Sequence, residues 1–201
     1  KDEPYRYASG QPVNNWDNKY IGSARVRYAI EHSMNVCAVR TLTETVGLEK
    51  GYKYLENFGF TTLVNNDPNY PGMSDIAQAT ALGGITRGVY NIEMTAAYAA
   101  IANSGIYTEP LLYTEILDHD GNVLIDNSKP ITRRVLKEST AFLLTSAMQD
   151  VINRGTGTPA RLNNMPAAGK TGTTENSTDL WLSAYTPYYT CSVWTGYDED
   201  K

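Results

Sequence analysis

Hydrophobic residues recur every three or four positions along much of the first half of the chain, a spacing typical of helices that bury one face. The repeat begins around Val26 and Ile30, is interrupted at Ser33–Asn35, and resumes as far as Gly47. Glycine commonly ends a helix because it adopts the left-handed conformation at little steric cost. The predicted helices span about residues 23–32, 36–46, 48–58, 92–103 and 137–153, with a shorter helical run near 74–82.

Apolar and polar residues alternate in two other parts of the chain, which is the pattern of a strand with one buried face. The first part surrounds Asp120-Gly121, a dipeptide typical of hairpin turns, and the second is divided by Pro187-Tyr188. The predicted strands are 107–118 and 123–125 in the first part, and 167–174, 179–186 and 189–197 in the second. Because helices and strands occupy separate stretches, the predicted fold class is α+β.

The domain organisation follows from the same division. Residues 1–22 are rich in Tyr, Asn, Pro and Gly and indicate an ordered, turn-rich surface segment. We expect a helical part at about 23–105 and a sheet part at about 106–135 and 164–198.

Composition narrows the possible functions. Hydrophobic residues make up 41% of the 201 positions and charged residues 19%, as in a folded globular protein. The net charge of −5 and the pI near 5.1 argue against nucleic-acid binding. Two cysteines and two histidines provide neither a disulfide framework nor a typical zinc site. No run of about 20 apolar residues indicates a membrane span.

Two short motifs contain residues suited to acyl transfer. Ser33-Met34-Asn35 lies in a predicted turn between helices, and Lys170-Thr171-Gly172-Thr173 begins a predicted strand. Each motif alone is common, and the simpler interpretations are a helix cap and a solvated strand end. Together and in this order, they resemble the Ser-x-Asn and Lys-Thr-Gly motifs of penicillin-binding proteins and class A β-lactamases.

The flanking sequences extend this resemblance over nearly the whole chain. They are similar to the transpeptidase domain of class A, bifunctional penicillin-binding proteins. The similar stretches are residues 91–105, 118–123, 148–157, 168–174, 180–189 and 193–198. The resemblance implies a penicillin-binding protein/β-lactamase-like transpeptidase fold, in which helices flank an antiparallel sheet beside a helical subdomain.

The third motif of the family, Ser-x-x-Lys, is missing. No serine of the chain has a lysine three positions later. In the family this motif supplies the nucleophile and precedes the segment that resembles residues 1–22, and the last strand is followed by a further helix. We therefore expect that the chain is a partial domain, lacking the nucleophile helix and the C-terminal helix, and that it is inactive alone.

The resemblance also implies a role for each site residue. Ser33 would relay a proton to the leaving amine, Asn35 would orient the substrate amide, and Lys170 would provide a positive charge. The Thr171 and Thr173 hydroxyls would bind a substrate carboxylate, and a backbone N–H at Thr173 would stabilise the oxyanion. Gly172 would let the acyl chain lie against the strand edge. The resemblance also implies that no metal and no organic cofactor is needed.

The expected ligands and location follow from the family. They are peptidoglycan stem peptides ending in D-Ala-D-Ala, β-lactam antibiotics, and the upstream remainder of the protein, which is expected to carry the nucleophile and a glycosyltransferase domain. The expected location is the extracytoplasmic face of the bacterial membrane. A D,D-carboxypeptidase or β-lactamase-type hydrolase and a non-catalytic penicillin sensor remain alternatives.

Several other polar residues have simpler explanations. His32 is expected on a helix surface, Asp118 and Asp120 are expected to stabilise a turn, and the tyrosines of 185–189 are expected to pack in the sheet. The segment Gly155–Gly157 is expected to be a helix exit near the rim of the site.

Overall fold

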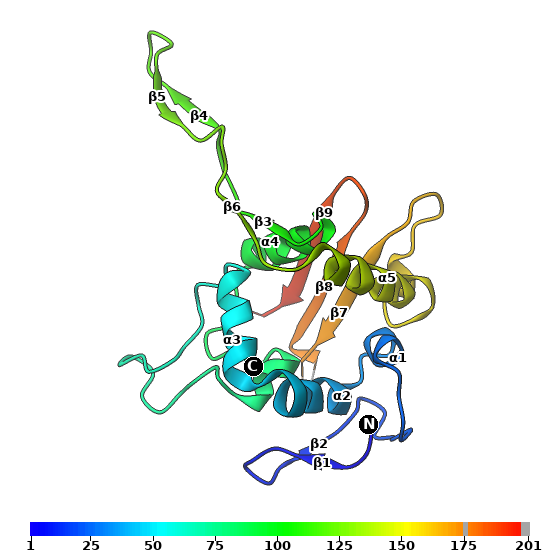
Figure 1. Cartoon of the computed structure of the whole chain (residues 1–201). Coiled ribbons are helices and arrows are strands. Elements are labelled where there is room, and N and C mark those ends of the chain that lie inside the picture. The colour runs from blue at the N-terminus through cyan, green and yellow to red at the C-terminus, as the bar shows by residue number, and fades with distance from the viewer. Residues whose placement is uncertain (175–176, 198–201) are drawn as a thin grey trace.

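The computed structural model describes residues 1–174 and 177–197, and its central feature is an antiparallel three-stranded sheet (Figure 1). Its strands are β7 (Ala168–Thr173), β8 (Asp179–Tyr185) and β9 (Thr190–Gly196), in the order β7-β8-β9. The three strands predicted in the last third of the chain and the α+β class are therefore confirmed. Because β7 is an edge strand, one of its sides has no strand partner within this sheet.

Two long helices cover one face of this sheet. Helix α5 (Glu138–Arg154) packs against β7, and helix α4 (Asn91–Ala102) packs against β8 and β9. A buried cluster of Met148, Ala168 and Tyr185 joins α5 to the sheet. The alanine-rich α4 buries Ala96, Ala97 and Ala100, and short side chains of this kind permit close approach to its neighbours.

The other face of the sheet is much more exposed. Side chains alternate along a strand, so β8 and β9 residues out of phase with Tyr185 point away from α4 and α5. Among them, Leu180 is 44% and Val193 is 52% exposed. This face is therefore apolar but accessible to solvent.

The segment before the sheet contains short helices on a small two-stranded ribbon. The ribbon consists of β1 (Tyr5–Arg6) and β2 (Pro12–Val13), and the helices are α1 (Val26–Glu31), α2 (Asn35–Arg40) and α3 (Leu48–Asn57). The predicted helix 36–46 continues beyond α2 as a π-helical turn, Thr41–Val46, and ends at Gly47 as expected. Val36 and Val39 are fully buried against Val13, which fixes α2 on the ribbon.

The predicted helical run near residues 74–82 is shorter in the structure. Only Gln78–Leu82 are helical, as a 3₁₀-helix. The buried Asp75 carboxylate accepts hydrogen bonds from the backbone N–H groups of Val64 and Thr86. This carboxylate links three loop segments, and that long-range role explains why its neighbours do not join a local helix.

The strand predicted over 107–118 is wrong as a single element. It divides at Pro110, which has no N–H to donate to a ladder. The first piece, β3 (Ile106–Thr108), pairs with β6 (Thr132–Arg134). The second piece, β4 (Glu115–Leu117), pairs with β5 (Val123–Asp126) in a hairpin that projects from the body of the molecule (Figure 1).

The turn predicted between these two strands is confirmed. Gly121 is left-handed at φ 84°, and the Asp118 carboxylate accepts hydrogen bonds from the backbone of Asp120 and Asn122. The hydrogen bonds from Asn122 lower the pKa of Asp118. Separately, none of the helices within residues 1–174 and 177–197 has the length and hydropathy required to cross a bilayer.

Candidate active site

Ser33 lies in a tight turn that ends α1. The backbone N–H of Met34 donates to Ala29 O at 2.9 Å, and that of Ser33 donates to Ile30 O at 3.2 Å. This pair of bonds is the Schellman ending of a helix, in which the left-handed position is usually glycine. Here that position is Ser33, with φ 53°. A serine in this conformation is disfavoured, and such residues concentrate at functional sites.

Residues before α1 fix the outer side of this turn. The Asn35 amide Nδ2 donates to Asn14 O at 2.9 Å, and the Trp16 indole Nε1 donates to His32 O at 3.3 Å. The Asn15 carboxamide oxygen accepts the backbone N–H of Val36. The turn-rich N-terminal segment thus helps to position Ser33 and Asn35, a role that composition alone did not indicate.

Lys170 reaches Ser33 from the edge strand of the sheet. Its Nζ donates to Ser33 Oγ at 2.7 Å and to Thr171 O at 2.8 Å, and the Ser33 contact joins positions 137 residues apart. Lys170 is the third residue of β7 and lies opposite Ser183 in the register. The structure therefore brings the two predicted motifs together.

The environment of Lys170 disfavours its charge. Burial lowers the pKa of the Lys170 ammonium from 10.5 to about 8, because the charged form loses solvation there. An amine with such a pKa can exist in both protonation states near neutral pH. The Lys170–Ser33 pair is thus suited to hold and transfer a proton.

The remaining predicted residues follow Lys170 along the open edge of β7. Thr171 is half-buried and its Oγ1 lies 2.7 Å from Thr156 Oγ1, while Thr173 is exposed at the end of the strand. At Gly172, an added Cβ would lie 3.3 Å from Trp181 Cβ, which is tight but not excluded. This edge can accept an extended ligand through its backbone groups.

The structure also shows where the polar residues lie for which the sequence favoured a simpler role outside catalysis. The segment Gly155–Gly157 directly follows α5 and reaches β7 through Thr156, as expected for a helix exit near the site. His32 stacks on Tyr28 with the ring centroids 3.9 Å apart. The prediction that the tyrosines pack in the sheet is confirmed for Tyr185, which is buried. It is wrong for Tyr188 and Tyr189, which are 73% and 82% exposed because they lie at the turn after β8.

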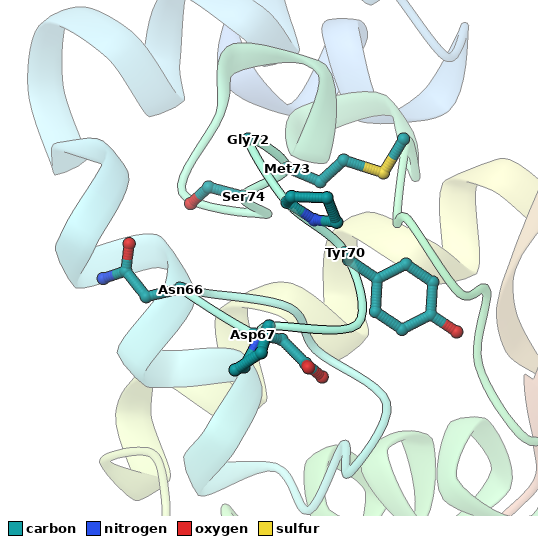
Figure 2. Close-up of a pocket in the computed structure, with 8 residues that line it drawn as sticks. Asn66, Asp67, Tyr70, Gly72, Met73 and Ser74 are labelled. Carbon is teal, nitrogen blue, oxygen red and sulfur yellow. The ribbon is translucent and has the colours of Figure 1, made fainter.

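A hollow of about 360 Å³ occurs elsewhere, in the loop of residues 66–74 (Figure 2). It contains no residue of either motif. Figure 2 shows the Asn66 amide and the Tyr70 ring pointing away from each other, so they do not converge on a common point. The Asp67 carboxylate accepts hydrogen bonds from the backbone and side chain of Asn69 and thereby stabilises its own loop. We therefore place the candidate site at Ser33 and Lys170.

Comparison with known proteins identifies the family of the chain. The family model described as "Penicillin binding protein transpeptidase domain" matches residues 1–201. The chain belongs to this family. Penicillin-binding protein 1A of Clostridium acetobutylicum is 39% identical over 98% of the chain, and penicillin-binding protein 1A/1B of Bacillus subtilis is 31% identical over 100% of the chain. The chain is thus a transpeptidase domain of the class A type, which confirms the resemblance.

Solved structures show the same fold. Penicillin-binding protein 1A from Haemophilus influenzae aligns over 99% of the chain and 34% of that protein, with a TM-score of 0.79 and 22% identity. PonA1 from Mycobacterium tuberculosis, in complex with penicillin V, aligns over 96% of the chain and 52% of that protein, with a TM-score of 0.81 and 23% identity. The transpeptidase chain spans only 24% of the C. acetobutylicum relative and 22% of the B. subtilis relative.

Sequence reasoning missed the residues that connect the two motifs. Glu31 accepts hydrogen bonds from Arg154 and from the backbone of Thr156, and the Thr156 hydroxyl contacts that of Thr171. The only local indication was the pair of glycines around Thr156. Glycines suggest a close backbone approach, but they do not indicate which segment is approached.

Proposed function

We propose that this chain is part of a serine D,D-transpeptidase that crosslinks peptidoglycan stem peptides and is acylated by β-lactams. The observation that carries the proposal is the 2.7 Å contact between Lys170 Nζ and Ser33 Oγ. A lysine buried beside a hydroxyl at an open strand edge is an arrangement suited to acyl transfer. The membership of the transpeptidase family supports the reaction class.

In the proposed reaction, a serine from outside this chain attacks the penultimate D-alanine carbonyl of a stem peptide. A lysine beside that serine accepts its proton, and the positive charge of Lys170 lowers the proton affinity of that lysine. Ser33 passes the proton to the departing D-alanine amine as the C–N bond breaks. An amine of a second stem peptide then attacks the acyl-serine ester, which forms the crosslink and releases the serine.

The other site residues bind and orient the ligand. Thr171, Thr173 and Lys170 receive the carboxylate that D-Ala-D-Ala and β-lactams share. Asn35 holds the substrate amide, with its own amide anchored to Asn14. A backbone N–H at Thr173 supplies part of the oxyanion hole, where one donor contributes roughly 3–4 kcal/mol to transition-state stabilisation in comparable enzymes. Gly172 keeps the strand edge free of a side chain.

The nucleophile is proposed to lie in an upstream segment of a longer protein, together with a glycosyltransferase domain and a membrane anchor. The exposed surface supports further packing partners, because it measures 13109 Å² for a 22.2 kDa chain. A compact monomer of that mass exposes about 9,400 Å². The projecting β4–β5 hairpin and the exposed face of the sheet contribute to this additional exposed surface. We place the complete protein at the extracytoplasmic face of the membrane.

Labelling with a fluorescent penicillin tests the proposal. The complete protein should form a covalent adduct that survives denaturation, whereas residues 1–201 alone should form none by intact mass. An adduct on the short chain would show that one of its own serines is the nucleophile. The absence of an adduct on the complete protein would leave only a non-catalytic role. Product analysis with an added acceptor amine then separates transfer from hydrolysis by a carboxypeptidase or β-lactamase.

A further inference from the structure

The loop after α5 is attached to the end of α1, close to Ser33. The Arg154 guanidinium Nε lies 3.2 Å from both oxygens of the Glu31 carboxylate, which is only 10% exposed. The backbone N–H of Thr156 donates to Glu31 O at 3.3 Å. A side chain at Gly155 would overlap that same carbonyl oxygen. The loop is therefore held against Glu31, which lies two residues before Ser33.

The same loop also touches the strand that bears Lys170. Thr156 Oγ1 and Thr171 Oγ1 lie 2.7 Å apart, and Thr171 directly follows Lys170. Contacts thus run in a closed ring from Ser33 to Lys170, along the strand to Thr171, across to Thr156, and back through Glu31. Such a ring fixes the relative positions of the proton-transfer pair and the hydroxyl at the strand edge.

The hydroxyl pair has a specific chemical consequence. A threonine hydroxyl has one proton to donate and two lone pairs to accept with. When Thr156 donates to Thr171, the proton of Thr171 is free to point outward to an anion. When Thr171 donates to Thr156, its proton is occupied within the protein. An anion at the strand edge selects the first arrangement, because only that arrangement offers it a donor from Thr171.

We propose that Thr156 is a positioning residue that holds the Thr171 hydroxyl with its proton directed at the carboxylate of the bound ligand. This inference rests on the proposed function, since it assumes that Thr171 receives the carboxylate. Thr156 acts through Thr171 and takes no part in the chemical step. The Glu31–Arg154 ion pair maintains the loop in the position that this contact requires.

A purely structural role for the Thr156 hydroxyl is disfavoured by its exposure. Thr156 is exposed, and a hydrogen bond between solvated hydroxyls contributes only about 0.5–1.5 kcal/mol to folding. Thr158, two residues later, provides the contrast. Its Oγ1 donates to Gly155 O at 2.7 Å, a bond within the loop that does not reach the sheet. The two threonines therefore form a matched pair for mutagenesis.

The test uses the complete protein and two ligands, a penicillin with a free carboxylate and its methyl ester. Valine at position 156 keeps the shape of threonine but removes the hydroxyl. Thr156→Val should lower the second-order rate constant for acylation by the free acid about tenfold, since hydrogen bonds to charged groups are the stronger ones. The rate constant for the ester should change less than twofold. Thr156→Ser should restore most of the lost rate.

Thr158→Val is the control, and the ratio of its two rate constants should match that of the unmodified protein. Equal losses with both ligands in Thr156→Val would show a general structural role and overturn the inference, as would an unchanged rate with the free acid. Failure of Thr156→Ser to restore the rate would also overturn it. The proposed function fails in a different way, by absence of any adduct in the unmodified protein. Thermal unfolding of each variant identifies a loss caused by misfolding.

Discussion

Of the turns that place a residue in the left-handed conformation, those at Gly121 and Ser33 have opposite settings. In the β4–β5 hairpin the residue is Gly121, and the hydrogen bonds around it join positions within four residues of each other. In the turn after α1 the residue is Ser33, whose side chain meets Lys170 from 137 positions away. The hairpin turn is satisfied locally, whereas the Ser33 turn depends on distant segments.

The difference in surroundings matches the difference in residue type. Glycine accepts a positive φ at little cost, so the hairpin needs no support from the rest of the fold. Serine in the same conformation is disfavoured and persists only where neighbouring structure holds it. Asn14 and Trp16 on one side, and Lys170 on the other, supply those contacts. The long-range contacts of Ser33 therefore hold the geometry of the candidate site, whereas the hairpin turn holds only itself.

The largest effect is expected from the long-range contact itself. Lys170→Ala should lower the rate of acylation of the complete protein by penicillin about 10²–10⁴-fold, because it removes the cation from the proton-transfer path. Folding should be retained, since the charge of a half-buried lysine with a depressed pKa does not stabilise the native state near neutral pH, and the contacts of Asn35 and Trp16 still hold the Ser33 turn. Lys137→Ala, at an exposed position before α5, is the control. An unchanged acylation rate in Lys170→Ala would refute the assigned role.

Substitutions in the loop after α5 should disturb the Ser33 turn, because this loop packs against Glu31 at the end of α1. A Cβ at Gly155 would overlap the Glu31 carbonyl oxygen, whereas one at Gly157 would meet the end of the Ile152 side chain, Cδ1, at 2.8 Å and no backbone atom closer than 3.3 Å. Gly155→Ala should therefore destabilise the domain by about 1–3 kcal/mol and slow acylation, as overpacking against backbone does. Gly157→Ala should have the smaller effect on both. Thermal unfolding and penicillin labelling measure the two quantities, and a reversed order would contradict this account.

The pH dependence of acylation tests the charge of Lys170. Since burial lowers the pKa of its ammonium to about 8, the rate should fall as the pH rises through about 8, approaching tenfold per unit. Lys170→Arg should be slower but lack this alkaline decline, because a guanidinium keeps its charge there. A decline near pH 8 that persists in Lys170→Arg would assign the titration to another group.

Unfolding does not provide an alternative explanation for that decline. The pKa of Lys170 is lower in the folded than in the unfolded chain, so between about pH 8 and 10.5 the unfolded chain holds the proton more tightly. This group therefore makes stability rise with pH across that window. Circular dichroism over the same range should show the fold retained where acylation declines.

The smallest effect is expected in the hairpin. Leu124 is 65% exposed on β5, whereas Val151 on α5 is fully buried. Leu124→Ala should change stability by less than about 0.5 kcal/mol and leave acylation unaltered. Val151→Ala should cost about 2 kcal/mol through the cavity that it creates beside the loop. A similar loss from both would show that the hairpin is packed against something in the complete protein.

Much of the local structure was predictable from the sequence. The helical repeat located α1, α2, α3, α4 and α5, and alternation located β7, β8 and β9. Turn chemistry located Gly121 and the interruption around Ser33. These features arise from interactions within a few residues, which is the range over which periodicity and glycine preferences act. The strand predicted over 107–118 was wrong because a non-local interaction decides the structure there: β3 pairs with β6 and not with the next strand in the sequence.

By itself, the sequence predicted which residues would take part in acyl transfer, and it determined which local element holds each motif. Only the tertiary structure decided that Lys170 is half-buried, that it reaches Ser33 Oγ, and that Thr156 meets Thr171. Those contacts join segments far apart in the chain, and they form only when α1, α5 and β7 pack together. Local preferences do not encode such packing, because it depends on the combined burial of residues from all three elements.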